Sequence, residues 1–338
     1  MTRNPSRPDN VTIAAWILTA AALVAMVLVH LIPALFGGLL VYQLVHMASP
    51  YLERNLSNER AKLVVVGLLA MVVVGVVTAA TFALIVFVQS DPDRPAALLG
   101  QFADMVLRAR DTLPAWVADL LPSDHDEVNA TLAGWVKGHA SDLEVAGRDA
   151  GRALVYAILG MMVGAMVALR SEVAHRPLGP LAAALATRVT NLASAFRRVV
   201  FAQVRISLIN TAFTAIYLAV LLPAFGVDLP LKKTLIAITF VAGLLPVVGN
   251  LISNTFIVIA SLSHSGEVAL FSLAYLVIIH KLEYFLNARI IGSRIQARAW
   301  ELLVAILAME AMFGIAGVIA APIYYAFLKD ELAARGLV

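Results

Sequence analysis

The sequence contains no cysteine and few charged residues, and each shortage excludes a class of protein. Without cysteine, the chain has no disulfide, no thiolate nucleophile and no cysteine-ligated metal. Charged residues make up 14% of the 338 residues, whereas soluble domains have about 25%. Hydrophobic residues make up 61%. This composition predicts an integral membrane protein.

Motifs for ATP hydrolysis and for common hydrolytic enzymes are also missing. The chain has no GxxxxGK(S/T) phosphate-binding loop, no HExxH helix and no GxSxG nucleophile turn. Its seven histidines show no metal-ligand spacing. We therefore predict a protein that is not an enzyme, with no cofactor, no catalytic residue, no metal site and no nucleic-acid partner.

The apolar segments predict an all-α polytopic membrane protein. We expect eight hydrophobic segments: about six full spans plus two broken or re-entrant helical hairpins, with a small helical extracytoplasmic subdomain. The first segment resembles a signal peptide, but a second follows at once, so we expect an uncleaved first span. The predicted regions are 1–89 with three spans, 90–151 as the subdomain, 152–205 with span four and an amphipathic cytoplasmic helix, 206–328 with the broken segments 234–262 and 301–328, and 329–338 as a cytoplasmic tail.

Charge is distributed unevenly around these spans. Residues 91–149 contain eleven acids and five lysines or arginines, and basic loops stay in the cytoplasm, so we expect this acidic segment outside. Its acids form either a solvated face or a vestibule that collects cations. Residues 170–205 contain six arginines and one acid, Glu172. This pattern favours a helix on the anionic cytoplasmic leaflet, or one packed against the protein.

The two broken segments are the strongest functional signal. Segment 234–262 is interrupted by Gly243-Leu-Leu-Pro246-Val-Val-Gly249-Asn250, and segment 301–328 by Phe313-Gly314-Ile-Ala-Gly317. Interrupted apolar segments in corresponding positions point to a transporter binding site. Each is either a kinked span or a hairpin that dips into the membrane and returns. A full-length helix of 28 residues, about 42 Å, can cross with tilt, so length does not decide.

The basic loop between the segments favours hairpins. Arg289, Arg294 and Arg298 precede any acid there, and a hairpin at 234–262 returns them to the cytoplasm. The two segments then belong to an inverted pair.

Several polar residues near the breaks are candidates for a solute or ion pathway. After the break formed by Pro246 and Gly249, Asn250, Ser253 and Asn254 lie on one helical face. They either hydrogen-bond a solute or cap the helix. Gly314 and Gly317 mark the second break.

Ionisable residues inside apolar segments are the other candidates. We expect Glu310 to be buried in an apolar arm, with a raised pKa, and to bind a proton or cation; the alternative is a structural ion pair. Glu283 lies on one face with His280 and Asn287. These three form either a cytoplasmic gate or an ordinary polar cluster at a helix end.

Three motifs together resemble the autoinducer-2 exporter family of bacterial membrane proteins. Leu245-Pro246-Val-Val-Gly249 is similar to its Ile-Pro-aromatic-Ile-Gly signature. Glu283-Tyr-Phe-Leu-Asn-Ala-Arg289-Ile-Ile-Gly292 resembles its Glu-Asn-aromatic segment, and Phe313-Gly314-Ile-Ala-Gly317 with Pro322 its final Phe-Gly-x-x-Gly…Pro run. Asn250 and Ala288 stand where the family usually has proline, and Glu310 where it has small residues.

The resemblance implies transport across the bacterial inner membrane, and secondary transport is our leading hypothesis. From the residues themselves we expect both termini in the cytoplasm, and region 206–328, which holds the two broken segments, as the transport core. The implied cargo is a small hydrophilic solute such as the quorum-sensing signal autoinducer-2, with ion coupling. The alternative is monovalent cation/proton antiport through Glu310 and Glu283, with Na⁺ and H⁺ as partners. A non-transporting membrane scaffold is a third interpretation. Anionic lipids are expected partners, and the resemblance implies a homo-oligomer.

Overall fold

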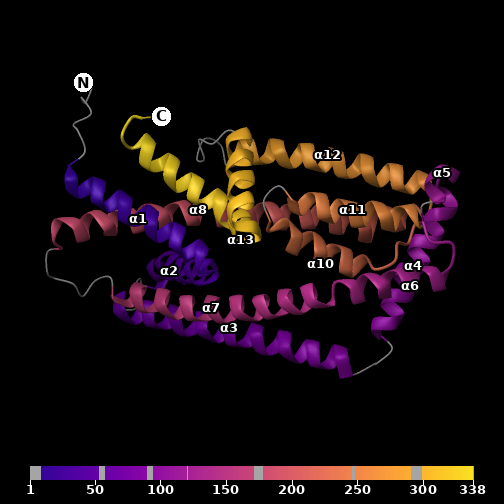
Figure 1. The fold of residues 1–338 in the computed structure, drawn as a ribbon, viewed down its shortest axis with the longest axis horizontal. Coiled ribbons are helices and arrows are strands. Elements are labelled where there is room, and N and C mark those ends of the chain that lie inside the picture. The colour runs from indigo at the N-terminus through magenta and orange to yellow at the C-terminus, as the bar shows by residue number, and fades with distance from the viewer. Residues whose placement is uncertain are drawn as a thin grey trace. The chain divides into compact units, whose positions relative to one another are not determined.

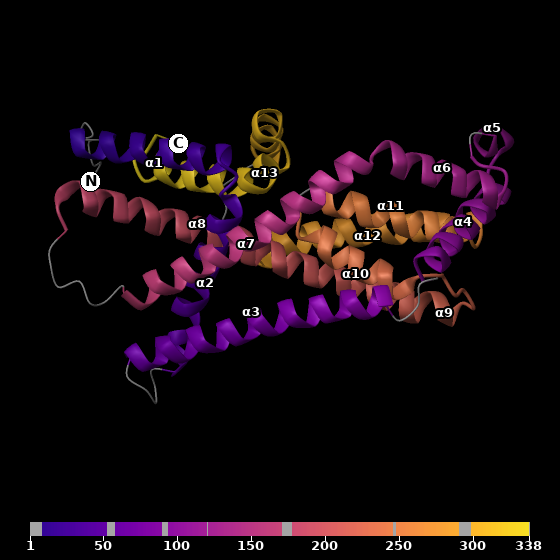
Figure 2. The same ribbon diagram turned by 60° about the horizontal axis from the view of Figure 1, so that its bottom comes forward.

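The computed structural model describes residues 9–52, 58–89, 94–119, 121–170, 178–245, 248–290 and 299–337. All secondary structure in these residues is helical, which confirms the predicted all-α polytopic fold. Five of the described helices are long and apolar enough to cross a membrane: Asn10–Leu28, Ile32–Tyr51, Ala140–Leu169, Pro180–Ala224 and Trp300–Ala333. The chain divides into two compact units. Figures 1 and 2 show its helices.

Unit 1 consists of residues 1–78, 145–200 and 295–338. Its helices are α1 (Asn10–Leu28), α2 (Ile32–Leu52), the first part of α3 (Asn58–Gln89), most of α7 (Ala140–Arg170), the first half of α8 (Pro180–Ile216) and α13 (Ala299–Ala333). A core around Leu39, Phe196 and Ile323 joins α2, α8 and α13. Among the described residues, unit 1 also has a partly open pocket of about 440 Å³ whose lining residues are apolar except for Tyr42 and Thr190.

Unit 2 consists of residues 79–144 and 201–294. Its complete helices are α4 (Arg94–Thr112), α5 (Ala115–Ala118), α6 (His125–Gly138), α9 (Leu222–Ala224), α10 (Lys232–Gly243), α11 (Val248–Leu262) and α12 (Gly266–Ile290). The second half of α8 continues through a π-helical turn, Tyr217–Leu221, into α9. The boundary that the sequence analysis placed between residues 205 and 206 therefore lies inside one continuous helix. Helices α10, α11 and α12 lie side by side, with α4 against the end of α11 (Figures 1 and 2).

The acidic segment 91–149 forms α4 to α6 and the start of α7, as its helical spacing predicts. Asp124 begins α6 by accepting a 2.8 Å hydrogen bond from the backbone N–H of Glu127. The Glu127 carboxylate accepts 2.7 Å bonds from the backbone N–H and the hydroxyl of Ser123, which hold the pKa of Glu127 below its ordinary value. This reciprocal cap fixes the start of α6. Thr112 donates to the carbonyl of Leu262 (3.3 Å) and so joins α4 to the end of α11.

Candidate functional site

The segment 234–262 is folded back on itself as two helices, α10 and α11. Gly249 brings them together, because a Cβ at this position would lie 2.0 Å from the carbonyl oxygen of Ala242. No side chain fits at that distance, so the two arms meet only if this residue is glycine. The sequence predicted an interruption at residues 243–250, and the second helix starts within it, at Val248. That this helix pair dips into the membrane and returns stays a prediction.

The tip of this hairpin exposes the carbonyl end of α10, where four backbone oxygens lose their helical partners. The chain's own turn satisfies two of them: Leu244 N–H donates to Val241 (3.2 Å) and Leu245 N–H to Ala242 (2.8 Å). For the oxygens of Phe240 and Gly243, the donors among the described residues come from another helix.

Helix α8 supplies those donors from one face. Gln203 Nε2 donates to the carbonyl of Gly243, and Ser207 Oγ donates to the carbonyl of Phe240, each at 2.7 Å. Three residues later, Asn210 Nδ2 donates to Oδ1 of Asn250 at 2.8 Å. The spacing i, i+4, i+7 places all three on one side of α8. This helix therefore holds both sides of the hairpin tip.

Asn250 is the centre of the polar cluster at the tip. Its Oδ1 faces α8, while its Nδ2 lies 3.4 Å from Nδ1 of His280 on α12. Its backbone carbonyl accepts a 3.3 Å bond from the buried Ser253. Next to Asn210, the Thr211 Oγ atom is buried and has no hydrogen-bond partner within the described part of the chain. The structure thus brings Asn250, Ser253 and His280 together. The sequence grouped Asn250 with Ser253 but did not predict the contact with His280.

Hydroxyl groups continue the polar face of α8 beyond the tip. Tyr217, on the π-helical turn, forms a 2.7 Å bond with Ser272, and Ser272 forms a 2.6 Å bond with Ser261. Ser261 Oγ lies 2.8 Å from the carbonyl of Ile257, so a chain of donors runs from Tyr217 to this backbone oxygen. π-Helical turns occur frequently at functional sites. The sequence did not predict this series of hydrogen bonds, because its members come from three separate helices.

The second broken segment, α13, also folds back, at Gly314 (Figure 1). The backbone there has φ 60° and ψ −144°, a region that only glycine occupies readily. Glu301 in the first arm accepts 2.5 Å bonds from Tyr325 and Lys329 in the second arm. A straight helix would separate Glu301 from Lys329 by about 42 Å, so this contact requires the hairpin.

Gly317 lies where the two arms of α13 meet, because a Cβ there would be 2.0 Å from the carbonyl oxygen of Met309. Glu310 does not lie between the arms: its side chain is exposed. The prediction that Glu310 is buried in an apolar arm is therefore wrong. A helix has two sides, and the apolar residues around Glu310 in the sequence do not determine which side its carboxylate occupies.

Three candidates fall wholly or partly outside the described residues. Nothing is described for Pro246 or for the side chains of Glu283 and Asn287. Asn254, which the sequence placed on the same face as Asn250, is partly buried on α11.

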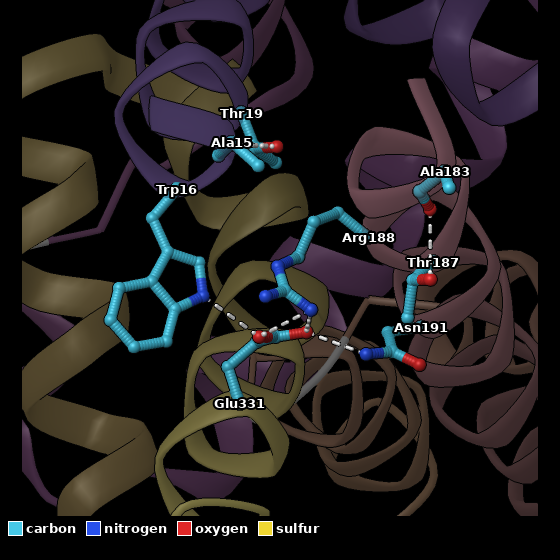
Figure 3. Close-up of polar contacts among 8 residues, drawn as sticks. All are labelled: Ala15, Trp16, Thr19, Ala183, Thr187, Arg188, Asn191 and Glu331. Carbon is cyan, nitrogen blue, oxygen red and sulfur yellow. Dashed lines mark hydrogen bonds and ion pairs between the residues drawn. The ribbon is translucent and has the colours of Figure 1, made fainter. Parts of the chain in front are cut away.

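A buried ion pair in unit 1, which the sequence analysis did not predict, fixes the end of α13 (Figure 3). Glu331 lies 3.3 Å from the Arg188 guanidinium of α8 and accepts bonds from Asn191 (2.5 Å) and from the indole N–H of Trp16 on α1 (3.1 Å). Glu331 and Arg188 are 7% and 8% exposed. The guanidinium of Arg335 lies over the Trp16 ring, and Asp330 pairs with Arg198. Residues 329–331, which the sequence assigned to a tail, are the last turns of α13.

The two units bury different kinds of polar side chain. Among the described residues that are both polar and buried, every charged side chain belongs to unit 1: Lys62, Arg188 and Glu331. Those of unit 2 are all hydroxyls and amides: Ser207, Asn210, Thr214, Thr239, Ser253, Ser261, Ser263 and Ser272. No group of three or more acidic or histidine side chains in the described residues could hold a metal ion. The tip of α10–α11 is thus equipped to hydrogen-bond an uncharged polar molecule.

A family model described as AI-2E family transporter matches residues 11–334 of this chain. No curated protein and no solved structure matches the chain.

Proposed function

Because the chain belongs to the AI-2E family of transporters, we propose that it is a secondary transporter that moves a small hydrophilic solute across the bacterial inner membrane. The multi-pass membrane fold and the lack of an ATP-binding loop support this reading. The resemblance to autoinducer-2 exporters makes that signalling molecule the first candidate solute.

The observation that most supports this proposal is the uncharged polar tip of the α10–α11 hairpin. A solute that leaves water must replace its hydrogen bonds, because an unpaired polar group in an apolar environment is costly. Asn210, Asn250 and the hydroxyl of Thr211, which has no partner among the described residues, offer donors and acceptors within two adjacent helices. Amides and hydroxyls both donate and accept, which suits the hydroxyl and carbonyl groups of a neutral solute.

Each residue of the tip has a distinct task in this proposal. Asn250 binds the solute from the start of α11, and Thr211 adds a hydroxyl from α8. Gln203 and Ser207 satisfy the carbonyls of α10, so the solute does not compete with unpaired backbone oxygens. His280 lies at the edge of the tip, on the exposed side of α12, where it serves as a gate.

Cation/proton antiport is the second candidate, and Glu310 is the residue that favours it. Its exposed carboxylate lies in the first arm of α13, which is otherwise apolar beyond Glu301, and ionisable residues in such segments are functional candidates. Ion coupling of solute transport would use the same residue. Among the described residues, unit 2 buries no charged side chain. We therefore place the uncharged solute in this unit, at Asn250.

Flux into liposomes that contain the purified protein tests the proposal. Candidate neutral solutes, autoinducer-2 among them, are compared with Na⁺ under imposed sodium and proton gradients. We expect saturable flux of an uncharged solute. Flux of Na⁺ against H⁺ without any solute flux would instead support antiport. No flux of any tested species in protein that is shown to be folded would favour the scaffold.

A further inference from the structure

We infer that the second half of α8 and the α10–α11 hairpin move as one rigid body, with Gln203 and Ser207 as the positioning residues that join them. The hairpin then does not open as a flap that swings away from α8. Only the consequence for transport rests on the proposed function; the joint itself does not.

The first argument is the hydrogen-bond inventory at the end of α10. The local turn satisfies the carbonyls of Val241 and Ala242, whereas those of Phe240 and Gly243 accept bonds from Ser207 and Gln203. If the hairpin left α8, both oxygens would lose these partners. Within a membrane protein no bulk water replaces them, so separation is strongly disfavoured.

The second argument is the close approach of the two helices. Ser207 has no exposed surface, and a Cβ on Gly243 would lie 2.7 Å from Ser207 Oγ and 3.2 Å from Ser207 Cβ. Such a distance leaves no room for water between α8 and the tip. The joint is therefore dry, and its hydrogen bonds are not exchanged with solvent while the helices remain in contact.

The third argument is that the contact extends along both elements. Beyond the tip, Tyr217 and Leu218 of the π-helical turn after α8 belong to one buried core with Leu235 of α10 and Ile257 of α11. Tyr275 of α12 stacks on Tyr217 and donates to the carbonyl of Phe213. Proteins repack interfaces of this kind as units rather than by gradual deformation. We therefore expect the second half of α8, α10 and α11 to change position together.

A reversible cross-link tests the joint directly, because the chain has no other cysteine. In Ser207→Cys/Gly243→Cys the two Cβ atoms start near 3.2 Å, close to the 3.5–4.5 Å of a disulfide. We expect the bond to form with a mild oxidant, and the oxidised protein to keep the flux of its reduced form. Loss of flux on oxidation, restored by dithiothreitol, would overturn the inference. So would failure to form the bond while both single variants react with thiol reagents.

A second measurement does not depend on knowing the solute. We expect the Ser207→Cys variant to be protected from a membrane-permeant maleimide under sodium or proton gradients of either direction. The matched control is Thr255→Cys, an exposed position on α11, which should react quickly. Labelling of both variants at similar rates would show that the hairpin leaves α8, and would contradict the rigid body. Absence of flux in the reduced protein would count against the proposed function alone.

Discussion

The two hairpins are built alike but are held in opposite ways. In each, a glycine of the second arm touches a carbonyl of the first: Gly249 on Ala242, and Gly317 on Met309. The first hairpin is held at its tip by uncharged groups of α8. The second is closed at its base by charged Glu301 and Lys329, and a Cβ at its turn residue, Gly314, would meet nothing within 4 Å.

This difference shows how one structural plan can serve two purposes. A buried ion pair is weak evidence for stability, but it fixes one arrangement, because a displaced partner leaves an uncompensated charge. Charged contacts therefore suit the anchoring of α13. A tip made of amides and hydroxyls has no fixed charge to neutralise, so it can exchange internal hydrogen bonds for those of a solute.

The largest expected effect concerns the anchor of the second hairpin. Glu331→Ala leaves Arg188 buried without its carboxylate partner, which should cost about 3–5 kcal/mol of stability. The apparent melting temperature in detergent measures this. Replacing both residues, Arg188→Leu with Glu331→Leu, should recover much of the loss. A single variant as stable as the wild type would show that the ion pair does not anchor α13.

The next effect concerns the turn of the second hairpin. Gly314→Ala places a Cβ on a residue with φ 60° and ψ −144°, at a cost of about 1–3 kcal/mol from backbone strain. The matched control is Gly67→Ala, on exposed α3, where a Cβ meets nothing within 4 Å. That change should stabilise the helix by about 0.5–1 kcal/mol. Equal melting temperatures for the two variants would contradict a sharp turn at Gly314.

Ser207→Ala tests the tip of the first hairpin and should have an effect of similar size to Gly314→Ala. It leaves the Phe240 carbonyl without its donor, which should cost about 1–3 kcal/mol. Ser253→Ala is the matched control, since that serine is equally buried but only bonds back to Asn250 in its own helix at 3.3 Å. If thermal melting shows the two variants equally stable, α8 does not hold the tip.

The sequence predicted both breaks because their causes are local. Glycine at 243, 249, 314 and 317 was enough to place them. It did not predict what holds them. Gln203 and Ser207 act through contacts with residues 40 and 33 positions away, and Glu331 pairs with Arg188 over 143 positions. A single sequence contains no signal for such pairs. The side of the helix that Glu310 occupies was unpredictable for the same reason.

The smallest expected effect on stability is at Glu310. Because its side chain is exposed, Glu310→Gln should leave the melting temperature unchanged. If antiport or ion coupling uses this carboxylate, the same variant should lose the pH or sodium dependence of flux. A fall in melting temperature comparable to that of Glu331→Ala would instead show that Glu310 has a structural partner.

The central claim is that the solute binds at the tip of the first hairpin, and a direct comparison of Asn250→Ala with Glu310→Gln tests it. Solute flux at saturating gradients would be measured in liposomes containing equal amounts of monodisperse protein. The account predicts that Asn250→Ala loses solute flux while Glu310→Gln still transports the solute. Full flux in Asn250→Ala, together with loss of solute flux in Glu310→Gln, would contradict it and place the transport site on the second hairpin.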